Sequence, residues 1–394
     1  MDQSKRHLQR FYGFAAAWSF NPTRGLWILY LLHCHWTLFE VGLSEAAFHL
    51  VAFLAEVPTG VIADRLGRRV SLLVGLLIHA ATTLMLLYLV PVSVTLGIVS
   101  VALGALSYAF VGGADQALLY DLVERAHGKE AYQRVYSRIL AFELAVQALS
   151  TAVGGWLAVT AGWSWPFAIA ALAALGGLSA LRSLPEPDRR LGVPGQGMAG
   201  ELRQALNLSR GVPGLRLWIV LGAMLGALVT INNLYAQSTL VLKGAPVSWA
   251  TTVVATAGLV TALGSFLGGQ EGKEKQLSWG SAFLGLFTAL FGTMPLTGGS
   301  AAYLVAAGLD GYVDPAYQAA LNHAAPESFR AAVLSLPSAL FSLLMILLFP
   351  IAGWAMGEGH LRAVYLGLGL GLGVAAAGFR RARAIPRSGS VVGE

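Results

Sequence analysis

Apolar segments of about twenty residues recur along most of the chain, and they constrain the fold more than any other feature. A helix of about twenty apolar residues spans the hydrocarbon core of a bilayer. We mark twelve such segments, with ends placed to within a few residues. They are 11–35, 43–62, 70–90, 95–121, 138–160, 164–184, 214–240, 248–268, 277–295, 300–322, 331–353 and 361–379. Because they are rich in Leu, Ala and Gly and do not alternate in polarity, they predict helices and not barrel strands.

The composition excludes the soluble classes of protein. Charged residues are 12% of the chain and hydrophobic residues 56%, whereas soluble domains carry about 25% charged residues. The first apolar segment is long and has no small-residue cleavage site behind a short apolar core, so we expect it to be retained as a helix. The fold predicted is an all-α membrane protein with 12 transmembrane helices.

The basic residues predict the orientation of these helices. Of the 26 Lys and Arg residues, 23 fall in the termini, alternate loops and helix ends that share one side of the membrane. Lys243 and Arg362 fall on the opposite side, and Arg24 lies within the first helix. Because cytoplasmic loops carry an excess of Lys and Arg, both termini are predicted to be cytoplasmic. The net charge of +6 therefore reflects membrane topology, and we expect no nucleic-acid partner.

The longest polar stretch divides the helices into two groups of six. We predict an N-terminal six-helix bundle over 1–184, a cytoplasmic linker over 185–213, a C-terminal six-helix bundle over 214–379 and a cytoplasmic tail over 380–394. The linker is rich in Pro, Gly and charged residues, as connecting segments are. Two helical halves joined in this way are typical of membrane transporters.

A loop motif carries a resemblance to a known family. Residues 60–69 read Gly-Val-Ile-Ala-Asp-Arg-Leu-Gly-Arg-Arg, and this resembles the G-x-x-x-D-R-x-G-R-R loop between helices 2 and 3 of the major facilitator superfamily. The runs Glu-Val-Pro-Thr-Gly at 56–60 and Ala-Leu-Leu-Tyr-Asp at 117–121 resemble a bacterial, drug-efflux-like branch of that superfamily. The resemblance implies two six-helix bundles in a bacterial inner (plasma) membrane.

The same resemblance implies a conformational latch. In the family, the aspartate of the motif contacts the start of helix 11, and a later arginine pairs with an acid at the end of helix 4. The corresponding positions here are Asp64, Arg68 and Asp121. The predicted latch residues are Gly60, Asp64, Arg65, Gly67, Arg68 and Asp121. Such a latch holds the cytoplasmic side closed and favours the outward-open state.

Two features depart from the drug-antiporter pattern. The fifth segment keeps the terminal Gly154 and Gly155 of a helix-5 motif but lacks its Gly-Pro pair. The fourth segment has Asp115 in the region where proton-coupled members carry an arginine. These departures leave the substrate and the direction of transport open.

Ionisable residues inside apolar segments are costly and therefore mark candidate functional sites. The resemblance implies that helices 1, 4, 7 and 10 line a central cavity. On these helices, the candidate proton-coupling residues are Asp115, Asp310 and Asp314. Glu56 and Glu143 lie on helices 2 and 5, so we interpret them as buried ion-pair candidates.

Polar and aromatic residues on helices 1 and 7 complete the candidate site. A cavity with aromatic walls and a few directing polar groups binds small organic molecules. The predicted substrate-binding residues are Arg24, Trp27, Tyr30, Asp115, Asn232, Asn233, Gln237 and Asp310. Interhelical hydrogen bonding is the alternative role for the polar residues of helix 7.

The resulting hypothesis is a secondary active transporter that works by alternating access. It predicts proton-coupled efflux of small amphipathic or lipophilic organic compounds by a monomer that resides in the lipid bilayer. The alternative is a proton-coupled uptake symporter for a polar or anionic nutrient, with Arg24 as the anion-binding group. An alternative of another class is a non-transporting membrane receptor. Because no nucleophile–base constellation, Walker A motif or H-E-x-x-H motif occurs, we expect no enzymatic activity, no cofactor and no metal site.

Overall fold

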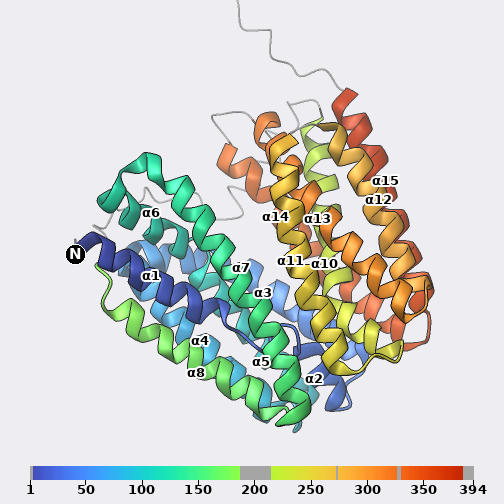
Figure 1. The fold of residues 1–394 in the computed structure, drawn as a ribbon, viewed down its shortest axis with the longest axis horizontal. Coiled ribbons are helices and arrows are strands. Elements are labelled where there is room, and N and C mark those ends of the chain that lie inside the picture. The colour runs from blue at the N-terminus through green and yellow to red at the C-terminus, as the bar shows by residue number, and fades with distance from the viewer. Residues whose placement is uncertain (1–2, 187–213, 272–273, 326–329, 385–394) are drawn as a thin grey trace, which may run out of the picture. The chain divides into compact units, whose positions relative to one another are not determined.

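The structure is a computed structural model that describes residues 3–186, 214–271, 274–325 and 330–384. Across these residues the chain forms fourteen α-helices and one short 3-10 helix, with no β-strand (Figure 1). The predicted all-α fold is therefore confirmed. Most of the predicted linker 185–213, and residues 385–394 of the predicted tail, lie outside the described residues.

Contacts between Cα atoms divide the chain into two compact units. The first comprises Met1–Pro194 with Val247–Ala255, and the second comprises Gly195–Pro246 with Thr256–Glu394. The boundary at Pro194 falls within the predicted linker. Residues Val247–Ala255, at the beginning of a later helix, are assigned to the first unit.

The first unit holds the helices from α1 to α8. They are α1 (Gln3–Ser19), α2 (Trp27–His33), α3 (Leu38–Leu66), α4 (Arg68–Leu89), α5 (Val94–Val111), α6 (Ala114–His127), η1 (Lys129–Ala131), α7 (Tyr132–Thr160) and α8 (Ser164–Arg182). In Figure 1, α1, α4 and α8 lie side by side, and α8 packs against both α1 and α4. Side chains from α1, α4 and α6, among them Phe14, Leu76 and Leu118, form a buried core there.

The second unit holds the remaining helices. They are α10 (Leu215–Leu242), α11 (Val247–Glu271), α12 (Glu274–Thr293), α13 (Leu296–Ala324), α14 (Arg330–Gly357) and α15 (Leu361–Ala384). The first residues of α11 belong to the first unit. Within the second unit, α12 packs most extensively against α15 and α13, and α10 packs against α14 and α15.

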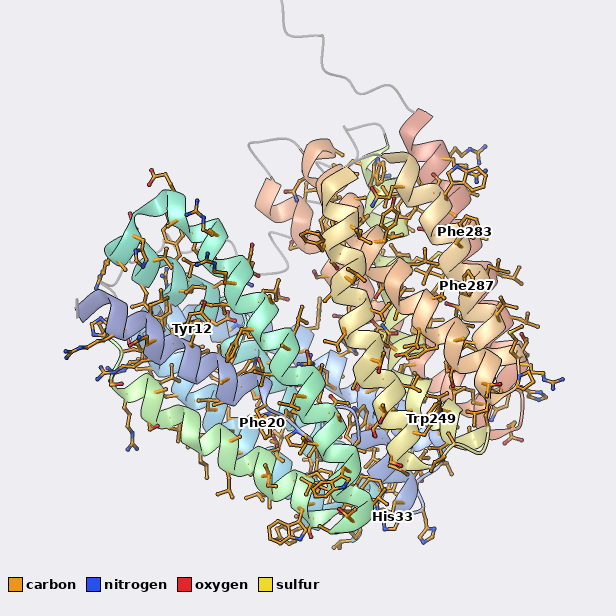
Figure 2. The ribbon with its side chains drawn as sticks, viewed as in Figure 1. Tyr12, Phe20, His33, Trp249, Phe283 and Phe287 are labelled. Carbon is orange, nitrogen blue, oxygen red and sulfur yellow. The ribbon has the colours of Figure 1, made fainter. Side chains whose placement is uncertain are left out.

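Large apolar side chains are exposed along the outer faces of these helices. On α12 they include Trp279, Phe283 and Leu286, and Figure 2 shows Phe283 and Phe287 one turn apart on the outer side of that helix. On α15 they include Leu366 and Leu370. Contiguous apolar surface of this extent is typical of helices that contact lipid.

Nine of the twelve predicted spans meet a criterion of length and apolar composition within the described residues. They correspond to α3, α4, α5 with α6, α7, α8, α10, α11, α14 and α15. The segments at α1–α2, α12 and α13 do not. The first is divided into two helices, α12 begins with Glu274, Lys275 and Gln276, and α13 carries Asp310 and Asp314 among many small residues. The count of twelve spans stays a prediction.

The prediction of one continuous helix is wrong at two segments. The segment 11–35 is interrupted between Ser19 and Trp27, and the segment 95–121 is interrupted at Gly112 and Gly113. Pro22 has no N–H to continue a helix, and Gly113 takes a φ of 77° that other residues avoid. Both interruptions place candidate functional residues at helix ends.

Candidate functional site

The interruption between α1 and α2 is held by one asparagine. The Asn21 side-chain oxygen accepts hydrogen bonds from the Thr23 backbone N–H at 3.1 Å and the Thr23 hydroxyl at 2.7 Å. Its amide nitrogen lies 3.2 Å from Nε2 of His79 on α4. All three side chains are buried. The backbone polar groups freed by the interruption thus acquire local partners, as burial requires.

Arg24 lies in this interruption and contacts α7. With the Gln147 amide oriented so that its oxygen faces Arg24, that oxygen accepts from Nε at 2.6 Å and from Nη1 at 2.8 Å. The positive charge of Arg24 also acts on Glu143, one turn earlier on α7, and on His79. Arg24 is therefore held by an amide and lies within electrostatic range of a carboxylate.

Asp115 lies at the second interruption, in the first turn of α6. Its Oδ1 accepts a hydrogen bond from the Gln116 backbone N–H at 2.7 Å. The N-terminus of a helix carries a partial positive charge and favours a carboxylate. Asp115 also interacts electrostatically with Glu143 and with Tyr136. In membrane transporters, interrupted helices commonly present such termini to substrates and ions.

These residues form a polar group within the first unit, which we call the first polar cluster. It consists of Arg24, His79, Asp115, Glu143 and Gln147. Three of the five, Arg24, Asp115 and Glu143, were predicted from the sequence. His79 and Gln147 were missed. The available signals were a histidine within the apolar segment 70–90 and a glutamine one turn after Glu143 in the segment 138–160.

The interruption between α1 and α2 packs closely against α7. A Cβ added at Gly154 meets the carbonyl of Pro22. Only glycine permits such an approach of α7 to the interruption. The glycine retained from the helix-5 motif therefore has a packing role beside Arg24.

The second unit contains its own group of polar side chains, which we call the second polar cluster. It consists of Asn232, Asn233 and Gln237 on α10 with Asp310 on α13. The Asn233 amide forms a hydrogen bond with the Asp310 carboxylate, and Asn232 donates to the Asn233 oxygen at 3.3 Å. Asn232, Asn233 and Asp310 thus come together, and Gln237 lies one turn after Asn233 on α10.

Two atoms of the second polar cluster have no hydrogen-bond partner among the described residues. They are Oδ1 of Asn232 and Nε2 of Gln237, and their side chains are 2% and 3% exposed. A buried polar atom without a partner is destabilising by about 1–3 kcal/mol. The cluster therefore retains one acceptor and one donor for a ligand.

Asp314 differs from Asp310 although both lie on α13. Its side chain is exposed, and its Oδ1 accepts a hydrogen bond from Gln318 at 3.3 Å. The negative charge of Asp314 acts on Asp310. Asp314 thus influences the second polar cluster electrostatically from outside it.

The structure corrects the predicted roles of several residues. Tyr30 is buried, donates a hydrogen bond to the Leu87 carbonyl at 2.6 Å and packs 4.6 Å from the ring of Phe167. It belongs to the packing of the first unit and is not a cavity wall, whereas Trp27 is half-buried on α2. Glu56 is exposed on α3, so the prediction that it takes part in a buried ion pair is wrong. Among the described residues neither Glu56 nor Glu143 forms a salt bridge.

The loop motif forms a tight connection between α3 and α4. Gly67 has a φ of 111° at the junction. Arg68 lies 2.6 Å from the Asp121 carboxylate of α6 and donates to the Ala117 carbonyl at 2.9 Å. The structure thus brings Arg68 and Asp121 together.

Other members of the motif make fewer contacts. Asp64 and Arg65 are exposed near the end of α3. For Gly60, another predicted latch residue, nothing among the described residues lies within 4 Å of a Cβ added there. Glu186 was not predicted from the sequence, and its Oε1 accepts a hydrogen bond from the Arg69 backbone N–H at 3.3 Å.

Comparison with known proteins assigns the family. Residues 10–313 match the Major Facilitator Superfamily. This chain belongs to the Major Facilitator Superfamily. Since the members of the family are membrane transporters, this protein is a multi-pass transporter, and the general part of the resemblance is confirmed.

Relatives of this superfamily protein agree with that assignment. The uncharacterized MFS-type transporter YxaM of Bacillus subtilis (strain 168) is 36% identical over 63 residues, or 14% of this chain and 16% of the relative's length. The matched part therefore spans about a sixth of that curated relative.

Solved transporter structures share the fold. The nucleoside transporter NupG has a TM-score of 0.77 at 14% identity, covering 98% of this chain and 100% of that one. A D-xylose-proton symporter has a TM-score of 0.74 at 16% identity, covering 98% of both chains. At such low identity the likeness shows the fold alone.

Proposed function

We propose that this superfamily protein is a proton-coupled secondary transporter of small amphipathic organic compounds that carry hydrogen-bonding groups. Alternating access exposes its binding groups first to one side of the membrane and then to the other. The two polar clusters supply those groups, one in each unit.

The second polar cluster is the observation that carries the proposal. Its carboxylate, Asp310, forms a hydrogen bond with Asn233, which lies next to Asn232 and one turn before Gln237 on α10. The buried Oδ1 of Asn232 and Nε2 of Gln237 have no partner within the described part of the chain. A carboxylate can take up and release a proton, while the free donor and acceptor can bind a solute. In this proposal the proton and the solute bind within one cluster of side chains, which allows their movements to be coupled.

The chemistry of the clusters favours a solute with hydroxyl, carbonyl or amide groups over a purely lipophilic one. Burying an amide against a lipophilic ligand leaves its hydrogen bonds unmade, which costs free energy. The D-xylose and nucleoside transporters that share the fold act on hydroxylated solutes according to their names. This supports the same class of solute here.

Efflux is the direction that we propose first. The support is the resemblance of the runs at 56–60 and 117–121 to a drug-efflux-like branch, together with the terminal glycines at 154–155 of a helix-5 motif that lacks its Gly-Pro pair. Uptake is the second candidate. It is favoured by Arg24, whose exposed guanidinium is positioned by Gln147 to receive an anionic group.

Flux into proteoliposomes containing the full chain tests the proposal. Solute exchange without a gradient, measured over a panel of sugars, nucleosides and amphipathic amines, identifies the cargo. An imposed pH gradient should then drive net accumulation that a protonophore abolishes. The sign of the gradient that drives it distinguishes exchange with protons from co-transport. Exchange of a solute with no response to pH gradients of either sign contradicts proton coupling, and no exchange of any class contradicts the solute assignment.

A further inference from the structure

A cavity of about 850 Å³ lies at one end of the second unit, and it shares no residue with either polar cluster. It is bounded by the end of α10, the turn between α12 and α13, and the turn between α14 and α15. Its lining includes three basic side chains, those of Lys243, His360 and Arg362. By volume it is comparable with sites for small organic ligands, which occupy about 300–1,000 Å³.

Lys243 is fixed at the wall of this cavity. Its ammonium group donates hydrogen bonds to the Phe291 carbonyl and, at 2.6 Å, to the Met294 carbonyl, and it lies 5.5 Å from the centre of the Phe291 ring. Two of its three donors are thereby used at the end of α12. The third remains for a ligand.

The positive charges of the cavity are close enough to oppose one another. Burial and the charge of Arg362 both lower the pKa of Lys243 below its usual value. Within the described residues neither Lys243 nor Arg362 takes part in a salt bridge, and Glu358, four residues before Arg362, is exposed. An anion placed between the two cations relieves this repulsion.

Backbone groups add to the positive potential. The helices α13 and α15 both begin at the cavity, at Leu296 and Leu361. The first N–H groups of a helix have no partner within it and favour anions. The cavity therefore combines cationic side chains with two helix starts.

We propose that this cavity binds a phosphate-type oxyanion, held by the guanidinium of Arg362 and the ammonium of Lys243. Arginine matches the oxygens of phosphate with two parallel hydrogen bonds, and lysine supplies a point charge. The lining of the cavity includes none of the residues proposed for transport, and the proposal does not depend on the transported substrate.

The surface beside the cavity accommodates an acyl chain. Arg362, Leu366 and Leu370 follow at intervals of four residues and so share one face of α15. Leu366 and Leu370 are 47% and 72% exposed. A phospholipid can place its phosphate at Arg362 and its chains along these leucines. Free phosphate supplies the same oxyanion without the chains.

Binding measurements on the purified full-length protein in detergent distinguish a phospholipid from free phosphate as the ligand. The probes are dioctanoyl-phosphatidylglycerol, dioctanoylglycerol as the lipid without phosphate, and inorganic phosphate. Native mass spectrometry and thermal unfolding report binding. Arg362→Gln should weaken phosphatidylglycerol or phosphate binding at least about tenfold, since a hydrogen bond to a charged group is worth about 1.5–3 kcal/mol.

Arg380→Gln is the matched control. Arg380 lies near the other end of α15, 4.6 Å from the centre of the Trp279 ring, and its substitution should leave binding unchanged. Lys243→Arg, which keeps the charge, should retain binding. Preference for phosphatidylglycerol over phosphate assigns the site to lipid, and equal binding assigns it to the free anion. Equal binding of dioctanoylglycerol, or an Arg362→Gln protein that binds both phosphate probes normally, overturns the proposal.

Discussion

Arg68, the first residue of α4, forms a salt bridge at 2.6 Å with Asp121 of α6, and its side chain is 29% exposed while that of Asp121 is 17% exposed. The same guanidinium nitrogen donates to the Ala117 carbonyl at 2.9 Å. The pair therefore joins the loop between α3 and α4 to a helix more than forty residues later in the chain. Because solvent screens it only in part, it should stabilise the first unit more than an exposed ion pair does.

Substitution of this pair should lower stability in a coupled way. We expect Asp121→Asn and Arg68→Gln each to reduce the free energy of unfolding by about 1–2 kcal/mol. The double variant should lose less than the sum, because either single change already breaks the contact. Denaturant unfolding of the purified protein measures the coupling. Arg65→Gln, at an exposed position of the same loop, is the control, and additive losses would contradict the pairing.

Gly67 should resist substitution for two reasons. Its φ of 111° is strained for any other residue, and a Cβ there meets the carboxylate of Glu186. Gly67→Ala should therefore destabilise the protein by about 1–3 kcal/mol from backbone strain, with a further loss from displacement of Glu186. Gly162→Ala is matched, since its φ is 101° and nothing among the described residues lies within 4 Å of the new Cβ. Equal thermal destabilisation of the two variants would show that displacement of Glu186 contributes nothing to the loss.

Asp310→Asn should separate proton coupling from solute binding. The amide cannot titrate, so accumulation driven by a pH gradient should be lost while exchange without a gradient continues. Asp314→Asn is the matched control because Asp314 is exposed and bonded to Gln318. Its accumulation should stay within about twofold of the unaltered protein, because exposed charges act weakly on their neighbours. Normal gradient-driven accumulation by Asp310→Asn would exclude this residue as the sole proton carrier.

Asp115 and Glu143 should titrate as a coupled pair. Each interacts electrostatically with the other, and Arg24 acts on Glu143. Coupled carboxyl groups titrate as a pair. Each single variant, Asp115→Asn or Glu143→Gln, should therefore keep a pH dependence of solute affinity from the carboxyl group that remains, at a pH shifted from that of the unaltered protein, and the double variant should lose the pH dependence attributable to the first polar cluster. Affinity measured between pH 5 and 8 for both single variants and the double variant tests this. Independent and additive shifts would show that the two groups titrate separately.

The sequence predicted the helices better than the sites because runs of apolar residues are sufficient to specify helices in lipid. The mean hydropathy of a twenty-residue segment does not detect the interruptions at Pro22 and Gly113. There a single missing N–H or a single backbone angle ends the helix. The contact of Arg24 with Gln147 joins segments more than one hundred residues apart. Tyr30 was placed wrongly because its environment depends on Phe167 of α8, which no local pattern reveals. The cluster at Asn232 and Asn233 was predicted because it arises mainly within one helix.

The orientation in the membrane can be tested at two exposed loop positions. The distribution of basic residues predicts Glu130, before α7, on the cytoplasmic side and Glu358, before α15, on the opposite side. With the single native cysteine removed as Cys34→Ser, Glu358→Cys should react with a membrane-impermeant maleimide added to intact cells. Glu130→Cys should react only after permeabilisation, because the bilayer separates it from the reagent. The reverse pattern would invert the topology. It would also move the basic cavity at Lys243 and Arg362 to the cytoplasmic leaflet, where a phosphate-bearing ligand would have to be sought instead.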